Sequence, residues 1–524
     1  MLSAADLPND IDALKAMVLA AGGREERHVT RIAQLEKLLA DVKRALFGRK
    51  SEKACPDQLE LALEDIETAV ETLNAAEEAD EQQVTGKPRS RKANRGSLPR
   101  HLPRIEEVIE PESTTCDCGH ERHVIGEDVS ERLDIVPAQF RVIVTRRPRY
   151  ACRSCESGIV QAPAPAHLIP GGMPTEATVA HVIVSKYADH LPLYRQAQIY
   201  RRQGIDLDRS TLATWVGRAA FELQPVYAAL LANLKWSSKL FMDETTAPVL
   251  DPGRRRTKTG FFWALARDDR PWSGEDPPGV AFTYAPGRSG QYAENILKDY
   301  RGILQVDGYA GYNRLLKRPG EDIQLAYCWA HARRKLHEVS QTGTTPIADE
   351  GLRQIARLYR IEKDIRGHLP EARLAARQEH SKPVIDGFEC WLTANRARVS
   401  AKSPLGEALK YIAKYWDGLN LFLIDGRIEI DSNAVERTIR PIALNRKNAL
   451  FAGHDKGAQN WAMIASLIET CKLNAIDPHA WLASTLVAIA QGHKQSDIDA
   501  LLPWNYNGAE KGQGHEHHRI EGHA

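Results

Sequence analysis

The stretch GILQVDGYAGY, residues 302–312, constrains the fold more than any other part of the chain. Residues 303–306 form a short apolar run of the kind that makes a buried strand. Asp307 and Gly308 end this run, so an acid stands at a strand end, where the backbone holds a charge rigidly and glycine lets another backbone come close. The alternative is an ordinary turn, in which the Asp307 carboxylate bonds nearby backbone groups. Further acids in comparable settings would favour the first interpretation.

A second acid follows the same pattern. The apolar residues 240–242 predict a strand that delivers Asp243. The chain between and beyond the two aspartates predicts two strands, a helix and a last strand, at residues 259–266, 280–284, 289–300 and 324–327. The strand that ends at Asp307 follows the helix, so the predicted order is strand, strand, strand, helix, strand, with acids on the first and last of these. Residues 324–327 would add a fifth strand.

A third acid lies in DSNAVERTIRP, residues 431–441. Ser432 or Asn433 can cap a short helix that carries Glu436 in its first turns. Basic residues follow closely and suit a phosphodiester substrate: Arg437, Arg440, Arg446 and Lys447. The alternative is an acid favoured by the helix dipole beside a solvated basic face.

Three acids on two strands and a helix suit a two-metal site for phosphoryl transfer. Mg²⁺ and Mn²⁺ prefer oxygen ligands, and a metal pair activates the attacking oxygen and stabilises the leaving one. Without the metals, carboxylates held together would repel one another, or one would take up a proton.

Two close cysteine pairs predict a structural zinc site. Cys116-x-Cys118 and Cys152-x-x-Cys155 flank a strand-like stretch, and four thiolates suit tetrahedral zinc with no open position for chemistry. The alternative is reduced, free cysteines. The eight cysteines are unevenly spaced, which favours a reducing compartment over a disulfide framework.

One more pair of possible metal ligands, Cys328 and His331, lies at the start of a basic helix that includes Arg333 and Arg334. Two ligands alone make a poor metal site. We therefore expect a structural role beside the acids.

A chain of 524 residues is too long for one core, so we expect a multidomain protein that mixes α+β and α/β units. The expected parts are a helical coiled-coil region (1–80), a basic flexible linker (81–104), a zinc-binding β unit (105–165), a helical region similar to a helix-turn-helix (170–235), a catalytic domain (236–450) with a helical insertion at about 345–425, a C-terminal helical element (451–506) and a disordered tail (507–524).

Two of these parts have alternative interpretations. The heptad stripes within residues 32–46 and 59–73 favour self-association, but an antiparallel hairpin without a partner also fits. The linker has no acid between residues 82 and 104, and its basic residues suit phosphates or a minor groove, or are simply solvated: Arg89, Arg91, Lys92 and Arg95 among them.

Three short helices are expected within the helical region. They cover residues 175–187 and 193–202, and a third is capped by Ser210 after a turn at Gly204. In a helix-turn-helix the last helix would expose Thr211, Thr214 and Arg218 to DNA. Trihelical packing without DNA contact is equally compatible with the pattern.

Five stretches carry a resemblance to a known family: MDETTAPVL, QVDGYAGY, YCWAHARRKLHE, DSNAVERTIRPIALNRKNALFAG and LLPWNY. They resemble the transposases of IS66-type bacterial insertion sequences. The resemblance runs over nearly the whole chain, from FGRKSEK near residue 47 to Tyr506, and includes GEDVSERLDIVPAQFRVI in the zinc region.

This resemblance implies a DDE transposase with an RNase H-like catalytic domain. Asp243, Asp307 and Glu436, all intact, would be the catalytic trio that binds Mg²⁺ or Mn²⁺. Water would cut at the element's ends, and the freed 3′-hydroxyl would attack target DNA by direct transesterification, without a covalent protein–DNA link.

Cys328-x-x-His331 is similar to a signature found after the second Asp in several DDE groups, which implies a supporting role. The implied partners are double-stranded DNA of the terminal inverted repeats and the target, and small accessory proteins of the same element.

Two rival functions share these residues. One is a nuclease of the same fold that hydrolyses nucleic acid without joining it, and the other is a zinc-dependent DNA-binding protein with a vestigial trio. The coiled coil, linker and zinc unit favour a transposase, because synapsis needs two ends held by paired subunits.

No apolar run approaches the ~18 residues of a membrane span, and there is no signal-peptide pattern. We therefore expect a cytoplasmic, nucleoid-associated bacterial protein that forms a homo-oligomer and has no membrane partner.

Overall fold

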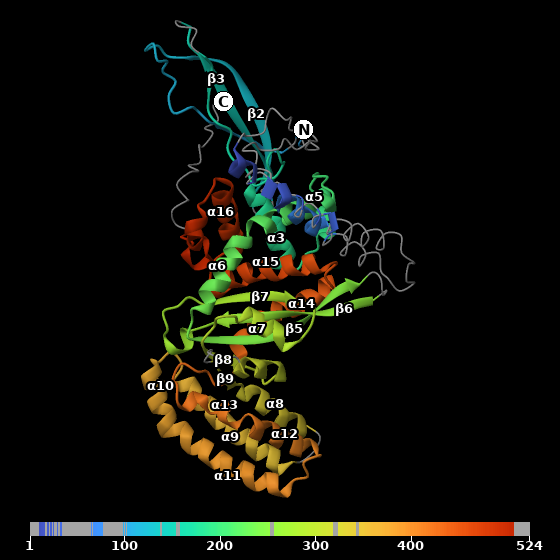
Figure 1. Ribbon diagram of the computed structural model, residues 1–524, viewed down its shortest axis with the longest axis vertical. Helices are drawn as coiled ribbons and strands as arrows, with labels where there is room; N and C mark the ends of the chain where they lie inside the picture. The colour runs from blue at the N-terminus through green and yellow to red at the C-terminus, as the bar shows by residue number, and fades with distance from the viewer. Residues whose placement is uncertain are drawn as a thin grey trace, which may run out of the picture.

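The computed structural model describes residues 102–136, 139–153, 158–251, 256–317, 323–341 and 345–507, with scattered residues of 10–33, residues 64, 67–76, 98 and 100. Figure 1 shows these parts stacked along one axis. A long β-hairpin projects at one end, a helical layer follows, a sheet lies in the middle, and a group of helices closes the other end.

A five-stranded mixed sheet forms the centre of the molecule. Its strands are β5 (Lys239–Asp251), β6 (Arg256–Arg267), β7 (Gly279–Ala285), β8 (Gly302–Val306) and β9 (Ile323–Tyr327). Their order across the sheet is β7-β6-β5-β8-β9. The first three strands are antiparallel to one another, whereas β5, β8 and β9 are parallel. All the predicted strands are present, and β5 lies at the centre.

The helix expected between β7 and β8 is shorter than predicted. Helix α7 (Gly290–Ile296) begins after Ser289, whose side chain accepts a hydrogen bond from the backbone of Gln291. It ends well before residue 300, and Asp299 adopts a left-handed backbone with φ of 67°.

Two helices from the end of the chain pack on the sheet. Helix α14 (Asn433–Ala449) lies against β5 and β6, and α15 (Asp455–Leu473) lies along β7. Ser466 and Thr470 of α15 accept hydrogen bonds from the backbone N–H groups of Phe282 and Val280. The edge of the sheet is therefore covered rather than open to another strand.

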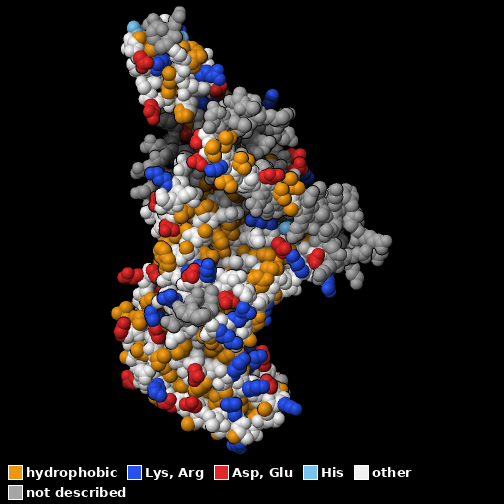
Figure 2. Space-filling view, in the orientation of Figure 1, with side chains coloured by type: hydrophobic (Ala, Val, Ile, Leu, Met, Phe, Trp, Pro, Cys, Tyr) orange, Lys and Arg blue, Asp and Glu red, His pale blue; other side chains and the backbone are white. Residues whose placement is uncertain are grey.

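The chain between β9 and α14 is helical, as predicted for the insertion. Its helices are α8 (Trp329–Ser340), α9 (Pro346–Asp364), α10 (Pro370–Ala376), a π-helical turn (Arg377–Ser381), α11 (Lys382–Arg398), α12 (Pro404–Lys414) and α13 (Trp416–Leu419). They enclose a separate hydrophobic core around Trp329 and Phe388. Figure 2 shows Lys and Arg side chains on the surface of this part, along one edge of the molecule.

A buried ion network joins this insertion to the sheet. The guanidinium groups of Arg373 and Arg377 are at most 1% exposed and bond Glu362, and Arg373 also bonds Glu429 at 2.7 Å. The fold tolerates the desolvation of these charges only because they are paired. Glu429 in turn exchanges two hydrogen bonds with the Gln305 side chain on β8, through its backbone N–H and carbonyl.

The helical layer consists of α3 (Glu176–Tyr187), α4 (Leu193–Arg202), α5 (Arg209–Glu222), α6 (Gln224–Lys235) and, from the C-terminal part, α16 (Pro478–Ala490). Two expectations for α5 are wrong. The residue at its N-cap is Asp208, because the helix begins one residue before Ser210. Arg218 is only 9% exposed and pairs with Glu222 at 2.9 Å, so it does not face solvent.

The helix at residues 67–76 packs against α5 at Gly217, the residue next to Arg218. Thr72 donates a hydrogen bond to the carbonyl of Gly217, and a Cβ at Gly217 would lie 2.4 Å from the carbonyl oxygen of Thr68. Only glycine permits this approach. The described heptad positions Val70 and Leu73 are half-buried, while Thr68 and Thr72 are fully buried. Most of the predicted coiled coil lies outside the described residues.

The projecting β unit contains β1 (Arg104–Val108), β2 (His123–Val136), β3 (Gln139–Ala151) and β4 (Val160–Gln161). Strands β2 and β3 form the hairpin, and β1 pairs with β3 in parallel. The linker residues Arg89, Arg91, Lys92 and Arg95 and the tail at 508–524 lie outside the described residues.

Candidate active site

Asp243 and Asp307 lie at the same end of two neighbouring parallel strands. Strand β5 pairs with β8 from Lys239 opposite Ile303 to Phe241 opposite Gln305. Continuing this register by two positions places Asp243 opposite Asp307. Two acids that are 64 positions apart in sequence are thereby brought side by side by strand pairing alone.

The turn after Asp307 is held by the helical insertion. Tyr411 and Tyr415 donate hydrogen bonds of 2.6 Å each to the carbonyls of Asp307 and Gly308. The Asp307 carboxylate accepts a bond from the backbone N–H of Tyr309 at 2.7 Å. Gly308 has φ of +99°, and a Cβ there would lie 3.0 Å from the Tyr411 hydroxyl. The position therefore requires glycine.

The turn interpretation and the strand-end interpretation of Asp307 are thus both correct. Its carboxylate does bond a nearby backbone group, and it also faces Asp243. Tyr411 and Tyr415 were missed in the sequence, because nothing in a helical stripe shows that two hydroxyls reach a turn about a hundred residues away.

Glu244, next to Asp243, is a further buried acid that the sequence did not single out. Its side chain is 0% exposed and is bonded by Arg288 at 2.6 Å and by the Tyr312 hydroxyl at 2.6 Å. Burial raises the pKa of Glu244, while the bonds from Tyr312 and Arg288 oppose the rise. Arg288 also stacks on the ring of Tyr309, 4.1 Å from its centroid. This cluster fixes β5 against the turn that carries Asp307.

Glu436 reaches the site on the first turn of α14. The segment before the helix is fixed by the Gln305–Glu429 pair and by a 3.0 Å hydrogen bond from the backbone N–H of Trp329 to Ile430. Ser432 lies at the N-cap, but its side chain makes no capping bond, and Asp431 accepts the bond from the N–H of Asn433 instead. The helix is also longer than expected, at 17 residues, and contains Pro441.

The electrostatics show that the three acids share one environment. Burial, followed by the charges of Asp307, Glu244 and Glu436, raises the pKa of Asp243 to about 8. Like charges act in this way only when they are close. Asp243 is therefore protonated at neutral pH in the absence of a cation.

The three carboxylates nevertheless do not form a closed ligand shell. Among the described residues, two groups have their ligand atoms within 4.8 Å of one another, and Glu436 belongs to the one with Cys328 and His331. Glu436 Oε1 lies 3.8 Å from His331 Nδ1. The carboxylate of Glu436 thus lies against helix α8, while its charge still acts on Asp243.

The predicted DNA-contacting residues within the described part of the chain differ in their exposure and contacts. Arg333 and Arg334 are exposed and line a groove of about 480 Å³ together with Tyr359 and Asn433. Arg437 and Arg440 are exposed on α14. Arg446, in contrast, is bonded to strand β5.

Arg446 is a structural residue in this arrangement. Its guanidinium donates a 3.0 Å hydrogen bond to the carbonyl of Thr246 on β5 and a second bond to the Thr246 hydroxyl. These bonds tie Arg446 to β5, and its contact with DNA stays a prediction. The side chain of Lys447 lies outside the described part of the chain.

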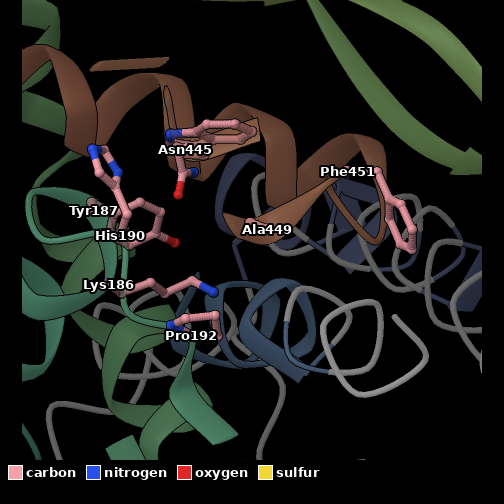
Figure 3. Close-up of a pocket in the computed structure, with 8 residues that line it drawn as sticks. Lys186, Tyr187, His190, Pro192, Asn445, Ala449 and Phe451 are labelled. Atoms are coloured by element: carbon pink, nitrogen blue, oxygen red, sulfur yellow. The ribbon is translucent and has the colours of Figure 1, made fainter. Parts of the chain in front are cut away.

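A small cavity of about 20 Å³ lies elsewhere, where the end of α3 meets α14 (Figure 3). Lys186, His190 and Asn445 point towards it. It has room for about one water molecule. It belongs to the packing of the helical layer and not to the carboxylate site.

Comparison with known proteins identifies the family. Residues 171–460 match the model of the transposase IS66 family. Two uncharacterized proteins of Sinorhizobium fredii, y4qI and y4jD, are 43% and 44% identical to this chain over 97% of its length and 99% and 98% of theirs. The chain belongs to the IS66 transposase family.

The remaining parts of this IS66 transposase also match models of the family. Residues 466–504 match the IS66 C-terminal element, and residues 113–156 match the zinc-finger binding domain of transposase IS66. Residues 34–106 match a model described as the transposase C of IS166 homeodomain. No helix among the described residues is both long and apolar enough to cross a membrane.

The zinc-finger region brings together three of the four predicted cysteine ligands. The thiols of Cys116, Cys118 and Cys152 lie within 4.8 Å of one another, and Cys155 falls outside the described residues. The first pair sits on a tight turn, in which the N–H of Gly119 bonds the carbonyl of Cys116. His120 Nδ1 lies 3.6 Å from the Cys118 thiol, a neighbour that the cysteine spacing did not reveal. The arrangement supports a structural zinc ion in this IS66 protein.

Proposed function

We propose that this IS66 protein is the DNA transposase of its element and catalyses metal-dependent cleavage at the element's ends and strand transfer into target DNA. Asp243, Asp307 and Glu436 are its catalytic residues. The observation that carries the proposal is the pairing of β5 with β8, whose register sets Asp243 beside Asp307 in a chain of this family. Burial and the neighbouring acids also raise the pKa of Asp243. A fold gathers like charges in this way when a cation compensates them.

The strand order supports an RNase H-like catalytic domain. Three antiparallel strands are followed by two parallel ones, and the first strand in sequence, β5, lies at the centre. The acids come from the central strand, from its parallel neighbour and from a helix that packs on β5. This is the arrangement that the resemblance to DDE transposases leads one to expect.

The donor set fits Mg²⁺ or Mn²⁺, because all three groups are carboxylates. When bound, a pair of such ions activates the attacking oxygen and stabilises the leaving one. The chain's own contribution is to hold the donors. Tyr411 and Tyr415 fix the turn of Asp307, and the Arg288–Glu244 pair fixes β5 beside it.

The basic residues around the acids suit the DNA backbone. Arg333 and Arg334 line the groove beside Asn433, and Arg437 and Arg440 are exposed on the helix that carries Glu436. Guanidinium groups bind phosphates through paired hydrogen bonds. We infer that double-stranded DNA of the element ends and of the target passes over this face, that the linker arginines assist, and that the protein acts as a homo-oligomer with accessory proteins of the element, at the nucleoid.

Incubation of the purified protein with labelled element ends and Mg²⁺ or Mn²⁺ tests the proposal. Joined products support it. Hydrolysis without joining would instead identify a nuclease, and binding without cleavage would identify a DNA-binding protein with a vestigial trio. Asp307→Asn is the matched control, since it removes one carboxylate charge while keeping the size of the side chain.

A further inference from the structure

A second cluster of ligand atoms lies beside the proposed catalytic acids. The Cys328 thiol, a ring nitrogen of His331 and a carboxylate oxygen of Glu436 are all within 4.8 Å of one another. Cys328 precedes helix α8 and His331 lies in its first turn, so the two side chains, three positions apart, share one face of the helix. Glu436 approaches this face from α14.

The spacing of these atoms is close to what a bound ion requires. A tetrahedral zinc ion with bonds of about 2.0–2.3 Å holds its ligand atoms about 3.3–3.6 Å apart. Glu436 Oε1 and His331 Nδ1 are 3.8 Å apart. This distance is too long for a hydrogen bond between the two groups, but small side-chain rotations would bring both to one ion.

The hydrogen bonding of the cluster also leaves a position for an ion. His331 Nδ1 is a buried atom without a hydrogen-bond partner in the described part of the chain, which is unusual for a polar atom. The backbone N–H of Ser432 donates to the Cys328 sulfur at 3.2 Å. Such a donor stabilises a thiolate and orients it, as groups around metal ligands do.

We propose that Cys328, His331 and Glu436 bind a transition-metal ion of the zinc class. A thiolate and an imidazole favour zinc over magnesium, whereas the two aspartates favour magnesium. Three protein ligands leave a fourth position for water, as in exchangeable zinc sites rather than closed structural ones. This site is separate from the thiolate cluster of the zinc-finger region.

The ion would act on the proposed catalytic site through Glu436. Two polar contacts of this carboxylate involve Oε1: His331 Nδ1 lies 3.8 Å away, and the Ser432 hydroxyl donates to it at 3.5 Å. An ion at this position therefore fixes the orientation of Glu436 relative to the two aspartates. This consequence rests on the proposed function, whereas the binding of the ion does not.

Counting metal ions in the full-length protein tests the proposal without DNA. The protein is stripped with a chelator, reloaded with Zn²⁺ and dialysed, and zinc per chain is measured by elemental analysis. We expect Cys328→Ser and His331→Asn each to hold one zinc ion fewer per chain than the wild type. Titration with Co²⁺ provides a second readout, since Cys328→Ser loses part of the thiolate-to-cobalt absorption.

Cys471→Ser is the matched control, because Cys471 is also a buried thiol but lies on α15 outside the cluster. It is expected to retain the zinc count of the wild type. Circular dichroism verifies folding, and His331→Asn decides the outcome if Cys328→Ser does not fold. Equal zinc counts in the wild type and a folded His331→Asn variant would overturn the proposal. Because no cleavage is measured, that result would leave the transposase function standing.

Discussion

Asp243→Asn is expected to stabilise the protein when no divalent cation is bound. Burial and the neighbouring acids raise the pKa of Asp243 from 3.8 to about 8. Between about pH 4 and pH 8 the unfolded chain has lost this proton while the folded chain retains it. The free energy of unfolding therefore falls as the pH rises through this range, and the loss is complete above about pH 8.

The size of the effect follows from the pKa shift. One pKa unit corresponds to about 1.36 kcal/mol, so at pH 7 the shift of Asp243 costs at most about 4 kcal/mol. Relaxation of the side chain and entry of water reduce this, and we expect a gain of about 2 kcal/mol in Asp243→Asn. Asparagine removes the charge at nearly constant size, so packing contributes little to the difference.

Urea unfolding, followed by tryptophan fluorescence in buffer free of Mg²⁺ and Mn²⁺, measures this gain at pH 5, 7 and 8. The difference between variant and wild type is expected to grow with pH. Addition of Mg²⁺ is expected to stabilise the wild type and not the variant, because only the wild type keeps the full donor set. Asp417→Asn, at an exposed acid on α13, is the control and is expected to change nothing. A variant no more stable than the wild type at pH 8 would refute the reasoning.

Four further outcomes follow from the structure. Asp307→Asn should lower the rate of DNA cleavage by about 10³-fold or more while DNA binding in a gel-shift assay persists; full activity would remove Asp307 from the site. Cys152→Ser should lower the zinc content by one ion per chain, and zinc-free wild-type protein in elemental analysis would exclude the structural site. Gly308→Ala should reduce stability by about 1–3 kcal/mol, because its φ is +99° and its neighbours are close, and unchanged urea unfolding would contradict this. Arg440→Ala should lower the salt dependence of DNA binding by about one unit of slope, whereas Arg446→Ala should lower stability, and the reverse result would contradict their assignments.

The sequence predicted the elements that carry the acids because their signals are local. An apolar run interrupted by an acid and a glycine is visible in the sequence around Asp307, and the strand at Asp243 is equally clear. The convergence of the acids depends on strand pairing over long distances. It was inferred from the chemistry of a carboxylate trio and from the family resemblance.

The features that were missed depend on contacts between distant segments. Tyr411 and Tyr415 lie in an ordinary helical pattern, and their bonds to the turn of Asp307 exist only in the folded chain. Arg218 looked exposed on an isolated helix, but in the folded chain it is 9% exposed and pairs with Glu222. The bonds of Arg446 to Thr246 on β5 likewise depend on how α14 packs against the sheet.

The role of Cys328 and His331 shows the same limit. Two ligands that are three positions apart make a poor site in a sequence, and the third, Glu436, comes from more than a hundred residues away. Glu436 comes within reach of Cys328 and His331 only in the folded chain, where the start of α14 meets the start of α8.

The central claim is that Asp243, Asp307 and Glu436 share divalent cations. Electron paramagnetic resonance of Mn²⁺ bound to the zinc-loaded protein tests it most directly, because two ions held a few ångströms apart give a spin-coupled spectrum. The account predicts a coupled Mn²⁺ pair in the wild type and its loss in Asp243→Asn, Asp307→Asn and Glu436→Gln alike. A coupled pair that persists in Glu436→Gln, or no pair in the wild type with DNA bound, would contradict it.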